Sequence, residues 1–419
     1  MLRLAATSDV FVHNMRPGAA TRLGIDYPAI SAANPRIVYA WASGYRADSA
    51  DRDRAAFDDV IQGESGLAAL NKGADGAPRY VPMVVSDKVS AHVLAGAVAM
   101  ALFARERTGR GQEVHVPMME TMAAFNLVDH LWHGVFGEPE KGLGYPRMLT
   151  PHRRPYATTD GHVCLLATTD RQWRNLFAAL NGGDGPPRYV PMVVGDKLCG
   201  HVLAGAVAMA LYAREKTGKG QEIHVPMVDT MAAFNLVDHL WHGVFGEPER
   251  GLGYPRMLTP YRRPYATKDG HVCLLATTDR QWRSLFAAID CPELGDDPRF
   301  SSIERRTANI DELYTLLAER MRRRTTAEWR ARLDQFDVPN GVVNDLPRLL
   351  ADPYLNETGF FRRVDHPTEG PTVTTAIPVS FSETPGELRL PPPRLGEHTA
   401  EILGELGYSP AEIAAISKG

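Results

Sequence analysis

The chain has 419 residues and a formal net charge of −4 at pH 7, with 44% hydrophobic and 23% charged residues. These proportions are those of a globular protein with room for two or three domains. The small acidic excess, without a sustained basic run, argues against nucleic acid as a partner. No run approaches 18 consecutive apolar residues and no signal peptide opens the chain, so we expect no membrane attachment and a cytoplasmic location.

The first part of the chain alternates strand and helix signals. Residues 9–13 (DVFVH) and 35–43 (PRIVYAWAS) read as strands, and Pro17 stands where a helix between them would open. Residues 57–70 predict a further helix. This alternation predicts a parallel α/β sheet. Because no βαβ unit precedes the first strand, we expect a sheet that is incomplete at this end, with an open edge that favours association.

The centre of the chain is a repeat. Residues 79–180 recur at 188–289 with a constant offset of 109, and the copies differ at 15 of 102 positions. In each copy, one aspartate (Asp87 or Asp196) lies between an apolar, strand-like run and a helix-like run ending in T-G-x-G-Q. In α/β enzymes reactive groups are often placed between a strand end and a helix start. An ordinary helix N-cap is the plain alternative.

Downstream of each aspartate the pattern continues with a long helix, a short strand and a second amphipathic helix. In the first copy these fall at residues 93–107, 113–116 and 120–135. The last part of the chain predicts charged helices over 304–335 and an extended connector over 365–393. Two short helices end it, the second capped by Ser409.

Neither histidine nor cysteine predicts a metal site. His130 and His133, repeated as His239 and His242, share a helix face, but ligation would need a further ligand and supporting hydrogen bonds. The four cysteines lack metal-type spacing, and two of them are one duplicated position, so free thiols in a reducing compartment are expected. The cysteines are Cys164, Cys199, Cys273 and Cys291.

Several segments, taken in order, resemble the class III CoA-transferases, also called the CaiB/BaiF family. They are DVFVHNMRPGAATRLGID (9–26), NPRIVYAWASGY (34–45), FDDVIQGESG (57–66), the aspartate-and-helix unit ending TGRGQ or TGKGQ, DPRF (297–300), DVPNGVV (337–343) and LGEHTAEILGELGYS (395–409). The resemblance implies a Rossmann-like large domain built from both ends of the chain, a smaller α/β domain, and interlocked homodimers. It also implies that the first fifth or so of the family pattern is absent.

The resemblance divides the chain into five parts. Residues 1–136 would form the first part of the large, CoA-binding domain with the first repeat copy, and 137–187 a connector with a partial small domain. Residues 188–245 would form the second copy of the aspartate-bearing unit. The small domain would follow at 246–350, and 351–419 would return to the large domain.

The resemblance places the family's catalytic carboxylate at Asp87 and, through the repeat, at Asp196. The implied reaction moves CoA from an acyl-CoA to a carboxylic acid through a covalent aspartyl-CoA intermediate, which divides one difficult exchange into easier steps. CoA and acyl-CoA are then substrates, and no tightly bound cofactor is needed.

The resemblance also supplies binding residues. Asn14, Met15, Arg16 and Arg22 would lie along the CoA site, where two arginines at a helix opening suit phosphate. Phe57 and Asp58 would line the reacting thioester. A plain helix cap is the alternative role for Asp58.

Two other functions stay open at this stage. An acyl-CoA racemase of the same fold would need a proton-exchanging histidine where Phe57 stands, and phenylalanine cannot exchange protons. A catalytically inactive, CoA-transferase-like protein would show weak or no binding of CoA.

Overall fold

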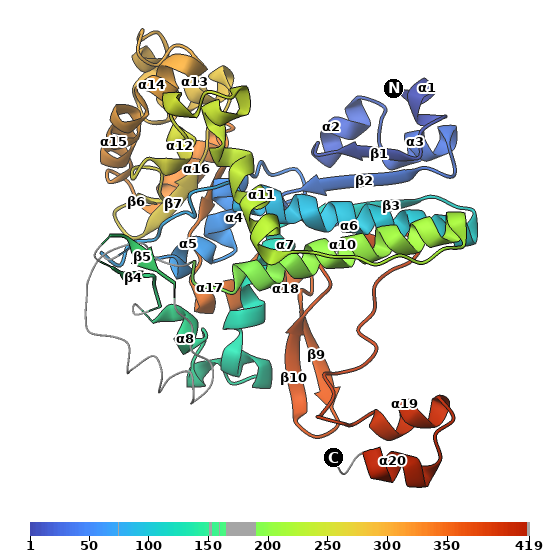
Figure 1. Cartoon of the computed structure of the whole chain (residues 1–419). Coiled ribbons are helices and arrows are strands. Elements are labelled where there is room, and N and C mark those ends of the chain that lie inside the picture. Colours follow the sequence, from blue (N-terminus) through green and yellow to red (C-terminus); the bar gives the residue numbers. More distant parts are fainter. Residues whose placement is uncertain (74, 151–152, 159, 165–189, 417–419) are drawn as a thin grey trace.

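The computed structural model describes residues 1–416 except 74, 151–152, 159 and 165–189. Its largest sheet has the strand order β1-β2-β3-β11, with β1, β2 and β3 parallel and β11 antiparallel (Figure 1). Its strands are β1 (Val10–His13), β2 (Val38–Ser43), β3 (Gln112–Pro117) and β11 (Ser380–Phe381). The chain is therefore a mixed α/β protein with a parallel-strand sheet, and β1 forms one edge of that sheet.

Helices cover both faces of this sheet. Along β2, Val38 and Ala40 pack towards α6 (Val85–Thr108), whereas Tyr39 and Trp41 pack towards α2 (Pro17–Arg22) and α3 (Tyr27–Ala33). Successive side chains of a strand point to opposite faces, and a strand buried on both faces needs a nearly continuous apolar run. The sequence of β2 satisfies this requirement.

Helix α6 begins earlier than the sequence predicted, at Val85, and ends at Gly109, which has a φ of 76°. The apolar run before Asp87 is not a strand, so that prediction was wrong. Side chains take up its backbone groups instead: the Val81 N–H donates to Gln62 Oε1 at 2.8 Å, and its carbonyl accepts from Arg262 at 3.0 Å. With those groups satisfied, the run does not need a partner strand.

The other elements of the first part of the chain are short, apart from α7, which follows β3 directly. They are α1 (Leu2–Ala5), α4 (Asp58–Glu64), α5 (Leu67–Leu70), α7 (Met118–His130), η1 (Trp132–Phe136), η2 (Pro139–Lys141), α8 (Pro146–Leu149), β4 (Tyr156–Ala157) and β5 (His162–Val163).

The second half of copy 2 builds the small domain, together with the residues that follow it. A three-stranded antiparallel sheet of order β6-β7-β8 packs against helices around a separate apolar core. Its elements are α12 (Pro255–Leu258), β6 (Tyr265–Ala266), β7 (His271–Leu274), α13 (Asp279–Ala288), η5 (Pro292–Gly295), α14 (Ile303–Ala308), α15 (Ile310–Met321), α16 (Thr326–Gln335) and β8 (Asn340–Val342). Capping boxes at Thr278 and Thr325 start α13 and α16.

The small domain is joined closely to the large one. A Cβ added at Gly63 of α4 would lie 2.1 Å from Cys273 Sγ, so only glycine lets α4 approach β7 this closely. The Asn344 N–H, just after β8, donates to the Gly63 carbonyl at 3.0 Å.

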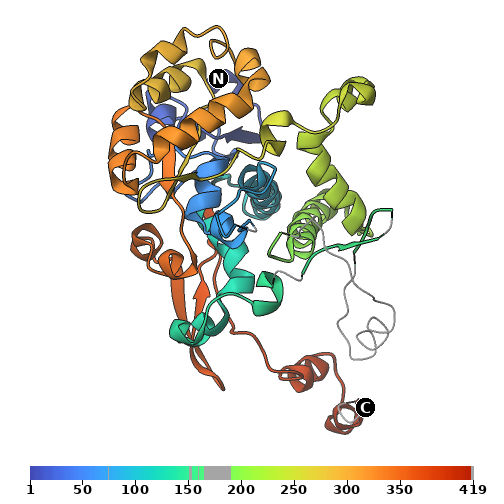
Figure 2. The same cartoon turned by 90° about the vertical axis from the view of Figure 1, so that its left-hand side faces the viewer.

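The first half of copy 2 packs against the first half of copy 1. Its α10 (Val194–Thr217) lies along α6, and both helices are seen nearly end-on in Figure 2. The helices meet at Gly96 and Gly205, where a Cβ on either would lie 3.4 or 3.3 Å from the other's Cα. The remaining elements here are α11 (Met227–His239), η3 (Trp241–Phe245) and η4 (Pro248–Arg250).

The same sequence takes different structures in the two copies. Gln112–Pro117 forms β3 between β2 and β11, whereas its copy at 221–226 is irregular and largely exposed. A strand needs hydrogen-bonding neighbours on at least one side. Copy 2 has no second β2 to supply them.

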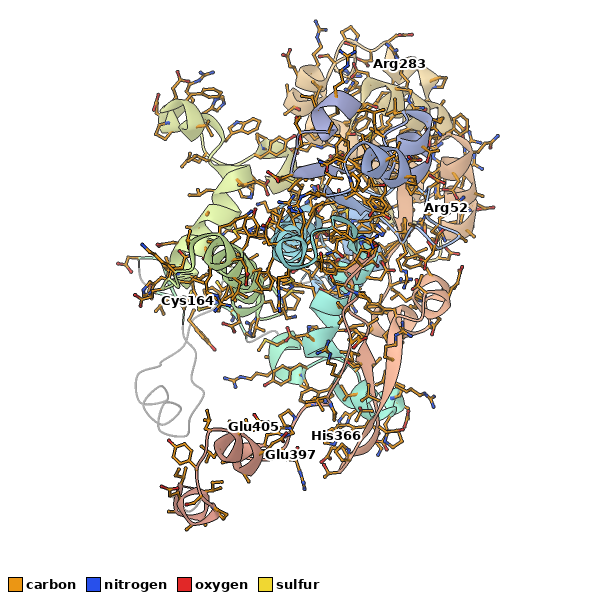
Figure 3. The ribbon with its side chains drawn as sticks, turned by 90° about the vertical axis from the view of Figure 1, so that its right-hand side faces the viewer. Arg52, Cys164, Arg283, His366, Glu397 and Glu405 are labelled. Atoms are coloured by element: carbon orange, nitrogen blue, oxygen red, sulfur yellow. The ribbon has the colours of Figure 1, made fainter. Side chains whose placement is uncertain are left out.

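The C-terminal part returns to the large domain through α17 (Leu346–Leu350) and α18 (Pro353–Glu357), where Tyr354 Oη donates to Glu120 at 2.6 Å. The predicted extended connector begins within an antiparallel hairpin of β9 (Phe361–His366) and β10 (Gly370–Thr375), so its first part was wrongly predicted. Beyond β11, α19 (Thr399–Glu405) and α20 (Pro410–Ile416) lie at the outer end of the molecule, near the labelled Glu397 and Glu405 (Figure 3).

Two long helices, α6 and α10, are apolar enough to cross a membrane by length and composition alone. Packing on the central sheet accounts for the apolar residues of α6. Helix α10 contacts α6 on one side and leaves apolar side chains such as Leu203, Val207 and Met209 exposed.

We predict that Gly96→Leu lowers the free energy of unfolding by about 1–3 kcal/mol, because the added side chain would overlap the α10 backbone. Urea unfolding followed by circular dichroism measures this loss. Gly200→Leu is the matched control, since no atom lies within 4 Å of a Cβ at that position of α10. Equal losses in the two variants would contradict the close approach of α6 and α10.

Candidate active site

Asp87 lies at the carboxyl edge of the parallel strands. It occupies the first turn of α6, whose other end packs at the amino edge, where Arg105 donates to the carbonyls of Asp9 and Arg36 ahead of β1 and β2. In open α/β sheets ligands bind outside the carboxyl ends of the strands. The side chain of Asp87 remains exposed there, as a group that must meet a substrate requires.

Asp87 does not cap its own helix. The N-cap residue is Val84, which makes no side-chain cap, and Asp58 of α4 takes this role from outside. Its Oδ1 accepts from the Ser86 N–H at 2.6 Å and from the Asp87 N–H at 3.4 Å. A buried carboxylate at the N-terminus of α6 both satisfies free N–H groups and interacts favourably with the helix dipole.

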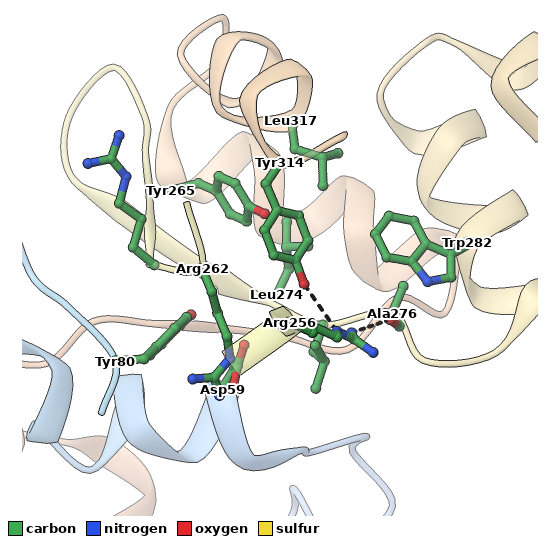
Figure 4. Close-up of a pocket in the computed structure, with 12 residues that line it drawn as sticks. Asp59, Tyr80, Arg256, Arg262, Tyr265, Leu274, Ala276, Trp282, Tyr314 and Leu317 are labelled. Carbon is green, nitrogen blue, oxygen red and sulfur yellow. Dashed lines mark hydrogen bonds and ion pairs between the residues drawn. The ribbon is translucent and has the colours of Figure 1, made fainter. Parts of the chain in front are cut away.

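A buried arginine holds this carboxylate. Arg262, between α12 and β6, pairs with Asp58 at 3.3 Å and with Asp59 at shorter range, and donates to the Val81 carbonyl. Figure 4 shows Arg262 and Asp59 together beside Tyr80, in a pocket that the small domain lines on its other side. The start of α4, the start of α6 and the small domain therefore meet at one ionic cluster.

The carboxyl groups of this region titrate abnormally. Partial desolvation, together with the neighbouring Asp59 and Asp238 carboxylates, raises the pKa of Asp87 to about 6 against the opposing effect of Arg262. Burial also raises the pKa of Asp58, and the Arg262 guanidinium opposes that rise. Desolvation and like charges both disfavour ionised carboxylates. Perturbed carboxyl groups of this kind cluster at functional sites.

An ion pair between the two copies lies in the same region. Asp238 of α11 forms an ion pair with Lys88 at 2.7 Å and accepts from the Val84 N–H at 3.3 Å. Both partners are largely buried, and Lys88 also donates to the carbonyl of Phe234. Asp87 therefore has residues of copy 2 on one side and α4 on the other.

Asp196 has different surroundings. It lies in the first turn of α10 and is exposed, and the neighbouring Lys197 pairs with Asp129 at 2.8 Å. Segment α4, which approaches Asp87 through Asp58, has no counterpart in copy 2, because the repeat begins after it. The structure thus brings Asp87, and not Asp196, next to the segment of Phe57 and Asp58.

The other predicted binding residues follow β1. Arg16 is the N-cap residue of α2, as expected, whereas Arg22, also expected at a helix opening, is the last residue of that helix. Asn14, Arg16 and Arg22 are exposed; Arg16 donates to the Asp53 carbonyl at 2.9 Å. Met15 is half-buried, and its N–H donates to the His13 ring at 3.1 Å.

Phe57 precedes α4 as its N-cap residue and is half-buried. Asp58, which was expected near a thioester, is buried in the ionic cluster, where its carboxylate is already bound by Arg262, Gln62 and the α6 backbone.

Two of the four histidines considered as metal ligands, His130 and His239, make hydrogen bonds within the protein. His130 bonds to the Pro191 carbonyl at 2.7 Å and to the Tyr145 N–H at 3.1 Å. His239 makes the corresponding bonds in copy 2, to the Pro82 carbonyl at 2.8 Å and to Tyr254. Each ring uses both nitrogens in joining segments of the chain.

Sequence reasoning missed the residues that surround Asp87 in space: Asp59, Lys88, Asp238 and Arg262. Arg262 is the first residue of the sequence RRPYAT at 262–267, which also occurs at 153–158 in copy 1. The sequence signals for this cluster were an arginine pair in the repeat and an acidic pair at the start of α4, and nothing in their spacing connects them.

The sequence was compared with known proteins. It matches CoA-transferase family III over residues 1–184 and again over 177–399. It is 25% identical over 417 residues to an acyl-CoA transferase of Fusarium pseudograminearum (strain CS3096), covering 99% of this chain and 67% of that protein. It is also 25% identical over 419 residues to formyl-CoA:oxalate CoA-transferase of Escherichia coli O139:H28 (strain E24377A / ETEC), covering 100% of this chain and 79% of that protein.

Solved structures were compared as well. A Mycobacterium tuberculosis protein is 20% identical, with a TM-score of 0.34, covering 96% of this chain and 78% of that one. A CAIB/BAIF family protein from Brucella suis is 22% identical, with a TM-score of 0.30, covering 97% of this chain and 77% of that one. The two family matches together span most of the sequence, and the chain belongs to CoA-transferase family III.

Proposed function

We propose that the chain is an acyl-CoA:carboxylate CoA-transferase whose nucleophile is Asp87. The observation that carries this proposal is the placement of Asp87: an exposed carboxylate in the first turn of α6, at the carboxyl edge of the sheet, with a pKa of about 6. Membership of the family supplies the reaction class. The cytoplasmic location expected from the sequence forms part of this proposal.

The reaction needs only the carboxylate and its two substrates. Asp87 Oδ attacks the thioester carbonyl, the C–S bond breaks, and the products are an aspartyl mixed anhydride and CoA thiolate. The thiolate attacks the aspartyl carbonyl and releases the first acid, which leaves an aspartyl-CoA thioester. The acceptor carboxylate repeats the sequence in reverse, so that CoA leaves on the acceptor and Asp87 is restored.

The surroundings of Asp87 suit this chemistry. Asp58 and Arg262 fix the first turn of α6, so the nucleophile is held before substrate arrives. Arg16 and Arg22 follow β1 at the same edge and provide cationic groups for CoA phosphates. Asn14, Met15 and Phe57 complete the proposed CoA-binding set.

We expect Asp87→Asn to lower kcat by at least about 10³-fold, since it removes the nucleophile. Incubation with acyl-CoA and hydroxylamine should convert Asp87 to a hydroxamate detectable by mass spectrometry. Asp196→Asn is the matched control and should retain activity. Modification of Asp196 instead, or full activity in Asp87→Asn, would refute the assignment.

The pH dependence follows from the raised pKa of Asp87. Only the carboxylate attacks, and it forms as the pH rises through the pKa, so kcat/KM should climb through about pH 6 and level off above it. With an ordinary aspartate, kcat/KM would rise near pH 4 instead. Initial rates between about pH 4.5 and 8 test this, and a flat profile from pH 5 upward contradicts it.

Arg22→Gln should weaken CoA binding by about 10-fold or more, the typical loss for a charged hydrogen bond to phosphate. Isothermal titration with CoA measures the Kd. Arg283→Gln is the control, because that arginine lies exposed on the small domain (Figure 3). Equal Kd values in Arg22→Gln and the unaltered chain would remove Arg22 from the site.

A further inference from the structure

The two copies contact each other reciprocally. Lys88 of copy 1 pairs with Asp238 of copy 2 at 2.7 Å, and Lys197 of copy 2 pairs with Asp129 of copy 1 at 2.8 Å. Because Lys197 is Lys88 shifted by the repeat offset, and Asp238 is Asp129 shifted by it, these are the same contact made twice. We call them the Lys88–Asp238 pair and the mirror pair.

Other contacts repeat in the same way. The Val84 and Val193 N–H groups each donate to the opposite aspartate at 3.3 Å. Each lysine also donates to a phenylalanine carbonyl of the opposite copy, Phe234 or Phe125.

The two arginines of the RRPYAT motifs also cross over. Arg262 of copy 2 donates to the Val81 carbonyl of copy 1 at 3.0 Å, and Arg153 of copy 1 donates to the Val190 carbonyl of copy 2 at 2.9 Å. Gly96 contacts Gly205, which is the same position in the other copy.

In an isologous interface each contact occurs twice, with the two partners exchanged between the two halves. Such an interface joins two identical subunits about a two-fold axis. Here it lies within one chain. The mirror contacts are buried and similar in length, so the relation is not a chance crossing of two apolar helices.

The two sides of this interface differ in what lies next to them. Beside Asp87, copy 2 supplies Asp238 and Arg262, and α4 supplies Asp58 and Asp59. Beside Asp196, copy 1 supplies Asp129 and Arg153, but the position of α4 has no equivalent segment.

We propose that copy 2 acts as a built-in second subunit: across an isologous interface contained in one chain, it lends the positioning residues Asp238 and Arg262 to the single working site at Asp87. This rests on the proposed function for the identity of the nucleophile.

The first test asks whether the two pairs are equivalent. Double-mutant cycles of Lys88→Ala with Asp238→Ala, and of Lys197→Ala with Asp129→Ala, measure coupling as the shift of the urea midpoint. We expect similar, nonzero coupling in both cycles. Coupling in one cycle alone, or in neither, overturns the reciprocal interface.

The location within one chain is tested by dilution. The unfolding midpoint of an intrachain interface does not depend on protein concentration, whereas that of an interface between chains rises with it. A midpoint that stays constant over about a 100-fold range supports the proposal. A midpoint that rises over this range refutes it.

The last test asks whether Asp238 affects the titration of Asp87 or only the stability of the chain. The charged groups facing Asp87 are Asp58 and Asp59 from α4, Asp238 with its partner Lys88, and Arg262. Asp238→Asn removes one negative charge beside Asp87, so that the field of the Lys88 cation is no longer offset, and this favours the ionised form of Asp87. The Asp87 midpoint should therefore fall by about half a pH unit or more.

The midpoint is read by ¹³C NMR of aspartate-labelled full-length chain, with the Asp87 signal identified by its absence in Asp87→Asn. Asp129→Asn is the matched control: it should cost as much stability as Asp238→Asn and leave the Asp87 midpoint unchanged. Equal shifts in the two variants, or no shift in Asp238→Asn, overturn the proposal. These readouts need no turnover, so a chain without CoA-transferase activity would refute the proposed function alone.

Discussion

The arrangement of the molecule depends on one buried ionic cluster. Arg262 compensates Asp58 and Asp59, and Asp58 in turn binds the first N–H groups of α6. Ions removed from water are tolerated only when their partners satisfy them, and removing one partner of such a cluster typically costs about 3–5 kcal/mol. The cluster therefore fixes three segments together: the start of α4, the start of α6 and the small domain.

This constraint explains why the two copies play different parts. The first half of copy 1 completes the large domain because α4 and β2 precede it. The second half of copy 2 completes the small domain because α13 to β8 follow it. Short connections favour neighbours in sequence. The first half of copy 2, which completes neither domain, packs against the first half of copy 1 through the reciprocal contacts.

The same division gives the two aspartates unequal chemistry. At Asp87, desolvation and the neighbouring Asp59 and Asp238 carboxylates raise the pKa to about 6 against the lowering effect of Arg262, while the side chain stays accessible. A CoA-transferase nucleophile has to be ionised at working pH and also available to a bulky thioester. Near neutral pH, a pKa of about 6 meets the first need, and the exposed position in α6 meets the second.

The sequence by itself determined the elements with strong local signals. The apolar run of β2 buries both of its faces, Pro17 opens α2, and Gly109 ends α6, so these were predictable from pattern and backbone preference. The sequence also predicted Asp87 as a candidate nucleophile, through the resemblance of its surroundings, and that assignment stays a prediction. Only the tertiary structure decided which of two nearly identical segments became which structure. Gln112–Pro117 is a strand because β2 and β11 flank it, and its copy at 221–226 is irregular because no such neighbours exist. Arg262 and Asp238 joined the site for the same reason: hydrogen bonds and ion pairs between distant segments depend on what the fold brings within reach, and local sequence does not encode that.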